Sequence, residues 1–269
     1  MIPPLGDAGA MSAVRPRTTI AMAVAVALAL VLAAGCRRSA GHVRVAAAAD
    51  LAKAFDEVGR AFTRKTGIKP SFTFGSSGLL AKQIAEGAPF DVYAAANINY
   101  VDEVVAAGAC DGASKKPYAR GRIVAWSKAQ KIGSLADLAD PRFVKVAIAH
   151  PDHAPYGKAG KEALQAAGVW PQVERKLVLA ENIRQTLQWA QDGSADAAIV
   201  SLSLAPVAEG GRSFTIDEKL HNPLVQALAV CKNGGARIKG QQFVDFLTSP
   251  EGTEIMKRYG FSLPDSPPQ

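Results

Sequence analysis

The residues best suited to chemistry in this chain are the serines of the loop Phe74-Gly75-Ser76-Ser77-Gly78. The loop follows an apolar stretch that predicts a strand, and it precedes a stretch that predicts a helix. The first N–H groups of a helix have no partner within the helix, and the helix dipole is positive at that end. Because the loop residues are small, these N–H groups and both hydroxyls can face one point. We therefore expect the loop to bind a small oxyanion.

Apolar and polar stretches alternate after about residue 41 in the way expected of an α/β protein. Short apolar runs predict strands, and apolar residues spaced three and four apart predict helices. In chain order, the first set of expected strands and helices covers residues 43–48, 51–65, 68–74, 79–86, 91–95 and 100–107. This strand–helix order favours a mainly parallel sheet flanked by helices.

A polar connector at 108–118 separates this set from a second one. The second set comprises expected strands at 123–126, 144–149, 177–179, 197–200 and 224–230, and expected helices at 135–138, 157–167, 183–191, 243–247 and 251–259. Two lobes, each with a mainly parallel sheet flanked by helices, explain this order if the chain crosses between them near 120–124 and 217–223. We therefore expect lobe 1 at 41–121 and 224–269, and lobe 2 at 122–223.

Residues 1–40 have the pattern of an export signal. Arg15 and Arg17 precede an unbroken apolar run from 20 to 34, and small residues then lead to Cys36. This end resembles the lipobox at which bacterial lipoproteins are cleaved and lipidated. We expect a protein of the periplasm or cell envelope, anchored through a lipid on Cys36. The alternative is a transmembrane anchor, for which the apolar run is barely long enough.

The charge and the remaining cysteines exclude some classes of protein. The formal net charge is +7, but the basic residues are scattered and form no stripe that would bind nucleic acid. The chain has no CxxC motif and no cysteine–histidine cluster, so we expect no structural zinc. Cys110 and Cys231 could pair in an oxidising compartment, but the sequence does not place them together, so their pairing stays open.

Short motifs also occur in a characteristic order over nearly all of the expected mature chain. They are AAAADL at 46–51, FGSSG at 74–78, AKQI at 81–84, GAPFDV at 87–92, PDHAPYG at 151–157, KEAL at 161–164, ENIR at 181–184, AIV at 198–200 and KRYGF at 257–261. Together they resemble the periplasmic molybdate-binding proteins of ABC transporters.

This resemblance implies a two-lobed periplasmic-binding-protein fold that closes on a tetrahedral dianion, molybdate or tungstate. In that family hydroxyls and backbone N–H groups hold the anion, without lysine or arginine. The resemblance further implies delivery of the anion to an ABC permease with its ATPase, without catalysis and without a cofactor. We expect a monomer, and the scattered charges indicate no nucleic-acid partner.

The resemblance also implies ligand-binding residues. Ser77, next to Ser76, matches the serine of the second strand–helix loop. Ile183 matches a position that donates a backbone N–H at a helix start, and Tyr156 matches one that donates a backbone N–H after a proline. Ser201 stands where a branch of the family has a tyrosine hydroxyl.

Asp50 departs from the family pattern, because many members have a serine at this place. An ionised carboxylate about 4 Å from a dianion would be repelled by several kcal/mol at an intermediate dielectric. Because Asp50 precedes the helix expected from Leu51, we interpret it as the N-cap of that helix. The alternatives are a protonated Asp50 that donates to a ligand oxygen, or a ligand that is not a simple dianion.

Three other functions are compatible with these residue types: a binding protein for another oxyanion, a binding protein for a metal ion, and a serine hydrolase. The ligands of a ferric or divalent ion would be Asp50, His150, His153 and Tyr156. A hydrolase would combine a loop serine with a histidine and an aspartate. However, the chain lacks the Gly-x-Ser-x-Gly nucleophile elbow, and the loop serines serve equally well as hydrogen-bond donors. We expect oxyanion binding, with no metal cation at the site.

Overall fold

The computed structural model describes Met1, residues 41–205 and residues 210–265. The expected export signal and Cys36 fall at residues 2–40, outside the described residues, so cleavage and lipidation stay predictions. None of the helices in the described part is both long and apolar enough to span a membrane.

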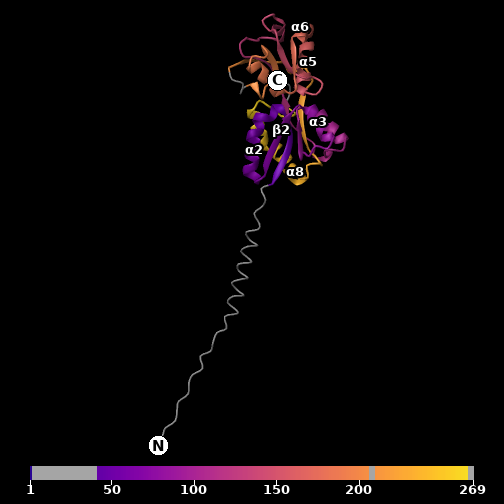
Figure 1. Ribbon diagram of the computed structural model, residues 1–269, viewed down its shortest axis with the longest axis vertical. Helices are drawn as coiled ribbons and strands as arrows, with labels where there is room; N and C mark the ends of the chain where they lie inside the picture. The colour runs from indigo at the N-terminus through magenta and orange to yellow at the C-terminus, as the bar shows by residue number, and fades with distance from the viewer. Residues whose placement is uncertain (2–40, 206–209, 266–269) are drawn as a thin grey trace. The chain divides into compact units, whose positions relative to one another are not determined.

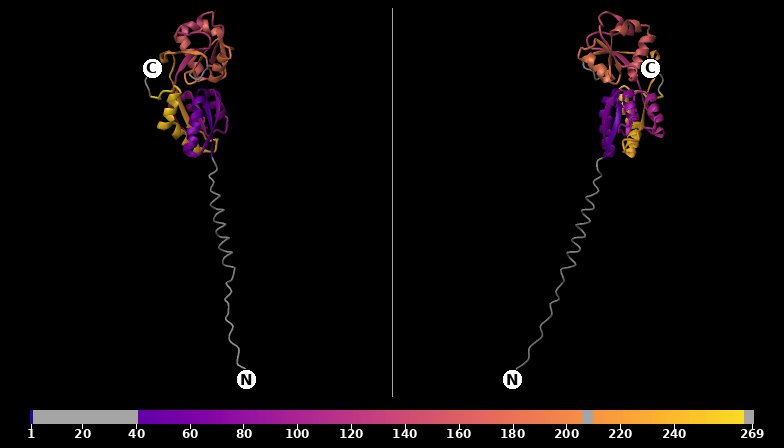
Figure 2. Two further views of the ribbon diagram at one scale, coloured as in Figure 1. Left: turned by 90° about the vertical axis from the view of Figure 1, so that its left-hand side faces the viewer. Right: turned by 45° about the vertical axis from the view of Figure 1, so that its right-hand side comes forward.

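The strands from residue 41 onward form two five-stranded sheets (Figures 1 and 2). The first contains, in spatial order, β2 (Lys69–Gly75), β1 (His42–Ala48), β3 (Val92–Ala95), β10 (Leu224–Val230) and β4 (Lys116–Gly121). The second contains β7 (Leu177–Ala180), β6 (Val146–Ala149), β8 (Ala197–Ser201), β5 (Ile123–Ser127) and β9 (Arg212–Thr215). The expected two-lobed α/β fold is confirmed.

Helices flank both sheets. Those of the first sheet are α2 (Ala52–Thr66), α3 (Ser77–Ala85), α4 (Ile98–Ala106), α8 (Arg237–Leu247) and α9 (Pro250–Arg258), and those of the second are α5 (Pro155–Ala166), α6 (Trp170–Val173) and α7 (Ile183–Gln191). The 3-10 turns are η1 (Ala49–Leu51), η2 (Gly112–Ser114), η3 (Leu135–Ala139), η4 (Glu174–Lys176) and η6 (Glu218–Leu220). Figures 1 and 2 show the C-terminal α8 beside the N-terminal α2 and β2, so the two ends of the folded chain build one lobe.

Each sheet is mixed, whereas the sequence predicted mainly parallel sheets. In the first sheet β1 runs parallel to β2 and β3, while β10 runs antiparallel to β3 and β4. The second sheet repeats this arrangement, with β6 parallel to β7 and β8 and with β5 antiparallel to β8 and β9. The antiparallel pairs involve the strands through which the chain leaves one sheet and enters the other, namely β4, β5, β9 and β10.

The chain passes from β4 to β5 at Gly121–Ile123 and returns between β9 and β10. We propose lobe limits at 41–121 with 224–269 and at 122–223, because each of these ranges supplies every strand of one sheet.

An aromatic cluster holds the N- and C-terminal parts of lobe 1 together. Phe55 and Phe62 of α2 are fully buried, and both rings contact Phe243 of α8, with centroids 5.8 and 5.3 Å apart. Phe72 of β2 contacts Phe55 at 5.2 Å. Such pairs add to the stability that the buried area alone provides. This packing fixes β1 and α2, and with them the turn that joins them.

Two strands were missed by the sequence analysis because both are polar edge strands. β4 begins inside the expected connector and contains Pro117, while β9 is partly exposed. A proline is tolerated at a sheet edge, where its missing N–H leaves no ladder bond unmade. Edge strands lack the apolar run by which buried strands are found in a sequence.

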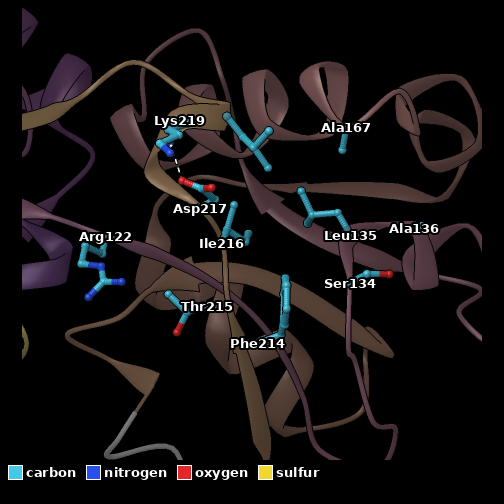
Figure 3. A pocket seen from close by; sticks show the side chains of 11 residues that line it. Arg122, Ser134, Leu135, Ala136, Ala167, Phe214, Thr215, Ile216, Asp217 and Lys219 are labelled. Atoms are coloured by element: carbon cyan, nitrogen blue, oxygen red, sulfur yellow. Dashed lines mark hydrogen bonds between the residues drawn. The ribbon is translucent and has the colours of Figure 1, made fainter. Parts of the chain in front are cut away.

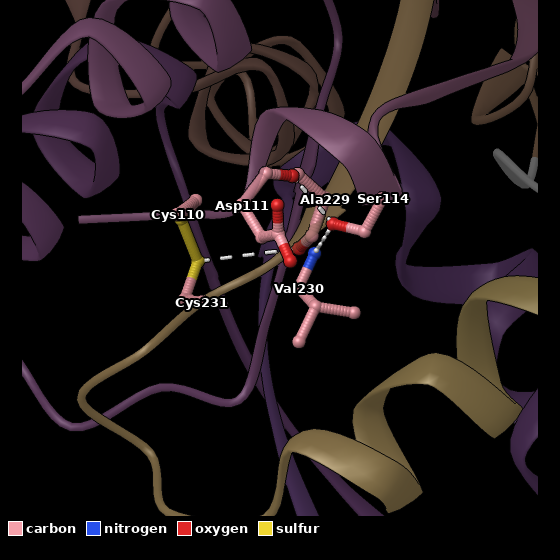
Figure 4. Close-up of a disulfide and its surroundings, with 6 residues drawn as sticks. All are labelled: Cys110, Asp111, Ser114, Ala229, Val230 and Cys231. Carbon is pink, nitrogen blue, oxygen red and sulfur yellow. Dashed lines mark hydrogen bonds between the residues drawn. A yellow bond between two sulfur atoms is a disulfide. The ribbon is translucent and has the colours of Figure 1, made fainter. Parts of the chain in front are cut away.

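Cys110 and Cys231 form a disulfide across a sequence separation of 121 residues. Figure 4 shows the bond near η2, where the hydroxyl oxygen of Ser114 accepts a hydrogen bond from the backbone N–H of Val230 at 2.8 Å. The pairing that the sequence left open is therefore present in the structure. The bond links the segment before lobe 2 to the segment after it, so it closes lobe 1 around the inserted lobe.

We expect the double variant Cys110→Ala/Cys231→Ala to lose about 2–4 kcal/mol of unfolding free energy, because a cross-link over a long loop limits the unfolded chain. Urea denaturation should measure the loss. A reducing agent should lower the stability of the wild type to that of the variant and leave the variant unchanged. Equal stability of both proteins in oxidising buffer would contradict the expectation.

Candidate functional site

The turn after β1 brings Asp50 to the centre of the molecule. β1 ends in small residues, and the chain then makes the 3-10 turn η1 before α2 begins. Asp50 lies within η1 and is fully buried. The preceding alanines, Ala48 and Ala49, leave space for neighbouring elements to approach closely.

The serines of the second loop lie at the start of α3. Ser77 is buried, and its hydroxyl oxygen accepts a hydrogen bond from the backbone N–H of Ala96 at 3.0 Å. Since this oxygen already accepts one bond, the O–H of Ser77 is the group available to donate to a ligand. The backbone oxygen of Ser77 accepts a bond from the Tyr93 hydroxyl at 2.7 Å, which fixes the loop.

Two helices of lobe 2, α5 and α7, begin next to Asp50 and the loop serines. α5 begins at Pro155, so the N–H of Tyr156 belongs to its first turn. α7 begins at Ile183, and its N-cap Asn182 accepts hydrogen bonds from two later N–H groups of the helix, at 3.1 and 3.2 Å. The N–H groups of Tyr156 and Ile183 have no partner within their helices. Both helices therefore direct the positive ends of their dipoles to this place.

These elements enclose a small cavity between the lobes. Its lining residues are Ala48, Ala49, Asp50, Gly75, Ser76, Ser77, Ala96, Ala154, Pro155, Tyr156 and Ile183. Five of the six predicted ligand-binding residues are among them. The cavity volume of about 10 Å³ gives room for about one water molecule.

Ser201, the sixth predicted ligand-binding residue, does not line this cavity. Its hydroxyl is hydrogen-bonded to that of Ser203 and also to Tyr156. Ser203 in turn donates to the backbone oxygen of Asp50 at 2.9 Å. Ser201 therefore supports Tyr156 from behind the cavity wall.

The carboxyl group of Asp50 belongs to a buried hydrogen-bond network that joins the lobes. Its Oδ2 accepts bonds from the Tyr156 hydroxyl at 2.9 Å and from Gln226 Nε2 at 2.7 Å. The Tyr118 hydroxyl donates to Gln226 Oε1 at 2.8 Å. Among the described residues, Oδ1 of Asp50 has no hydrogen-bond partner although it is buried. Burial raises the pKa of Asp50 to about 6, against the lowering effect of the bonds from Gln226 and Tyr156.

The interpretation of Asp50 as an N-cap is wrong. The N-cap of α2 is Leu51, and the hydrogen bonds of the Asp50 carboxyl go to side chains of other elements. The reason is the additional 3-10 turn, which places Asp50 inside a turn. Its side chain there points toward Tyr156.

Gln226 and Tyr118 were missed by the sequence analysis. Gln226 is a fully buried polar residue in the otherwise apolar strand β10. Buried polar groups need hydrogen-bond partners, so an isolated glutamine in such a run was a usable signal. Tyr118 lies in β4, the edge strand that the sequence analysis treated as a connector.

His150 and His153 lie next to this site but do not complete a metal site or a catalytic triad. His153 Nδ1 is 2.8 Å from Ser76 Oγ, and its ring stacks on that of His150 with centroids 4.9 Å apart. Burial lowers the pKa of His153, and the neighbouring His150 adds to this effect. The carboxyl of Asp50 contacts Tyr156 and Gln226 instead of a histidine. Within residues 41–205 and 210–265, no three His, Cys, Asp or Glu side chains cluster as metal ligands would.

Backbone contacts hold the lobes together beside the cavity. The N–H of Gly78 in α3 donates to the backbone oxygen of His153 at 2.9 Å. A Cβ at position 78 would lie only 2.8 Å from that oxygen, so the approach depends on glycine. Across the two lobes, the Arg184 guanidinium of α7 lies 5.9 Å from the ring centre of Phe74 in β2.

Several larger pockets occur in the described part of the chain, and two of them bear on the choice of site. A pocket of about 570 Å³ within lobe 2 is lined mainly by apolar side chains, such as Leu135, Phe214 and Ile216, and by none of the predicted ligand-binding residues (Figure 3). A groove of about 450 Å³ shares Ala49 with the small cavity and carries Lys53 and Arg184. The small cavity is the place where donors for an anion converge.

Comparisons with known proteins agree with this geometry. Residues 43–262 match the family model of the bacterial extracellular solute-binding proteins. The chain is 35% identical to the molybdate-binding protein ModA of Rhodobacter capsulatus over 83% of this chain and 89% of that protein. It is 32% identical to ModA of Azotobacter vinelandii over 85% of this chain and 92% of that protein.

A solved structure shows the same fold. The periplasmic molybdate-binding protein of Azotobacter vinelandii superimposes with a TM-score of 0.76 and 26% identity, over 83% of this chain and all of that one. The resemblance found in the sequence is thereby confirmed, and members of this family bind solutes and are not enzymes. The chain belongs to the family of bacterial extracellular solute-binding proteins.

Proposed function

We propose that this protein binds molybdate or tungstate in the cavity between its lobes and delivers the anion to an ABC permease with its ATPase. The observation that carries the proposal is the convergence of three helix N-termini and the Ser77 hydroxyl on one small cavity between the lobes. Helix N-termini and oriented hydroxyls stabilise a buried anion by dipoles and charge-assisted hydrogen bonds. The relatives with this architecture are molybdate-binding proteins by name.

Each proposed ligand-binding residue has a defined role. Ser77 donates its hydroxyl hydrogen, while Tyr156 and Ile183 donate backbone N–H groups from helix starts. Ser76 orients the loop through its contact with His153. Such neutral donors bind an anion only at the distances that their elements set, so an anion of another size leaves donors unpaired.

Ligand entry requires the lobes to separate. A cavity with room for about one water is too small for a tetrahedral oxyanion, so the lobes must open for the anion to enter and must close around it to a wider separation than in this form. The basic side chains of Lys53 and Arg184 in the adjoining groove would attract an anion toward this opening. Closure by bending at the two crossings then presents a joint surface of both lobes to the permease.

The place of action follows from the N-terminal pattern and the family. We propose export to the periplasm or cell envelope with a lipid anchor at Cys36, a monomeric state, and no catalytic activity or cofactor. A membrane-held binding protein keeps its captured anion close to the permease.

The ligand is tested by thermal unfolding of the purified mature protein with molybdate, tungstate, sulfate, phosphate, ferric iron and divalent metals. At a concentration about 100 times Kd, binding stabilises the native state by about 2.7 kcal/mol, or roughly 5–10 °C in Tm for this size. We expect such shifts with molybdate and tungstate at micromolar concentration. A shift with metal ions and none with any oxyanion would overturn the proposal.

Ser77→Ala should weaken molybdate binding by about 10–100-fold, because a charge-assisted hydrogen bond contributes about 1.5–3 kcal/mol. Calorimetric titration measures the change. The matched control is Ser114→Ala, since Ser114 is also buried in lobe 1 and accepts a bond from a backbone N–H. Ser114→Ala should keep the wild-type Kd. Equal Kd values for all three proteins would remove Ser77 from the site.

Asp50→Asn should change how the stability of the ligand-free protein depends on pH. The raised pKa means that the folded wild type holds more protons than the unfolded chain between about pH 4 and 6, so this contribution to stability is lost as pH rises. Relative to Asp50→Asn, the wild type should lose about 2 kcal/mol of unfolding free energy between about pH 4.5 and 7.5. Urea denaturation at both pH values tests this. A difference that stays constant over this range would show that Asp50 has an ordinary pKa.

A further inference from the structure

The cavity wall contains one group that the proposed oxyanion site does not use. Asp50 is fully buried and lines the cavity, and its Oδ2 is held by the Tyr156 hydroxyl and by Gln226 Nε2. Its Oδ1 has no hydrogen-bond partner in the described part of the chain. An orphaned buried acceptor is rare in proteins and requires an explanation.

We propose that Oδ1 of Asp50 shares one proton with an oxygen of the bound oxyanion, so that binding of a fully ionised tetrahedral oxyanion takes up one proton. This inference rests on the proposed function, because it requires the oxyanion to occupy this cavity. It names a residue that makes the site sensitive to the protonation of its ligand.

A shared proton lets an oxyanion lie beside this carboxyl group. A carboxylate oxygen and an oxyanion oxygen are both acceptors, so they cannot bond without a proton between them. The two donors on Oδ2 come from α5 and β10, and they prevent the side chain from turning away. Two like charges in a buried site raise one pKa strongly, so one of the two groups takes up a proton.

The surrounding groups do not neutralise Asp50. The titratable side chains that face it are Tyr156 of α5 and Tyr118 of β4, and burial raises the pKa of both well above 10. From β10 and the segment after β8 it meets the neutral side chain of Gln226 and the Ser203 hydroxyl. Three more distant groups complete the set: Lys53 of α2 and Arg184 of α7, both exposed, and His153, which contacts Ser76. Burial alone already favours the protonated form of Asp50.

The proton balance depends on the ligand. Molybdate carries no proton at neutral pH, so a proton from solvent is placed on Asp50 Oδ1, which then donates to a ligand oxygen. Hydrogen phosphate carries its own proton, which can take the same position while the carboxylate accepts it. No bond within either oxyanion breaks. Binding of molybdate is thus coupled to pH, and binding of hydrogen phosphate is not.

Calorimetric titration of the full mature protein with molybdate, in two buffers of different ionisation enthalpy, measures the proton uptake. At pH 7.5 we expect about one proton per bound molybdate, and above this pH we expect Kd to weaken by about tenfold per unit. Asp50→Asn keeps the shape and places an NH₂ donor where Oδ1 lies. Its proton uptake should fall to zero, and its Kd should not change with pH.

His153→Gln is the control, because His153 is a second titratable group next to the cavity, besides Asp50, and its ordinary pKa lies near neutral pH. The variant should still take up about one proton per bound molybdate. Wild-type binding without proton uptake, or uptake that persists in Asp50→Asn, overturns the inference while the proposed function stands. If Asp50→Asn does not fold, a protonated-carboxyl band in the infrared difference spectrum of the wild-type complex decides, and its absence overturns the inference. If molybdate, tungstate and phosphate all fail to bind the wild type, the proposed function and this inference fall together.

Discussion

The hydrogen bonds that join Asp50 to Tyr156 and Gln226 tie both lobes to one buried carboxyl group. A carboxyl group removed from water must be paired, hydrogen-bonded or neutral, and here every bonded partner is an uncharged donor. This requirement explains the polar layer between two apolar lobes, in which a glutamine interrupts strand β10 and a tyrosine lies on edge strand β4. It also explains why the lobes meet in a definite arrangement, since each donor comes from an element whose position is fixed by its own sheet.

The same layer sets the character of the cavity. Its walls offer hydroxyls and helix N-termini, whereas the basic side chains lie outside in the groove. Backbone N–H groups and buried hydroxyls cannot change position to suit a ligand as a flexible lysine can, so the affinity for an anion depends on how well the anion fits the cavity. The charges of Lys53 and Arg184 in the groove act over a longer range, and their attraction for an anion does not depend on how well the anion fits the cavity. The groove can therefore attract anions in general, while the cavity discriminates between them by fit.

Much of this could be predicted from the sequence, and the exceptions have physical reasons. Buried strands and amphipathic helices leave a periodic pattern, so the two lobes and the loop at Ser77 were predictable. The edge strand β9 has no buried residue, and β4 combines Lys116, Pro117 and Arg120 with only short apolar stretches, so neither leaves such a pattern. The hydrogen-bond partners of Asp50 were not predictable, because an aspartate before a helix has the same local sequence whether it caps that helix or bonds across an interface. Only the approach of Tyr156, distant in sequence and close in space, distinguishes these cases.

The backbone contact between Gly78 and His153 sets how closely the two lobes approach each other beside the cavity in this form. Its N–H···O bond joins the two main chains directly, beside the cavity. The separation of the lobes in the closed form is therefore a property of the backbone, and no side chain can adjust it by choosing another rotamer. The cavity in this form has room for about one water, so a bound oxyanion must hold the two lobes further apart here and lengthen or break this contact.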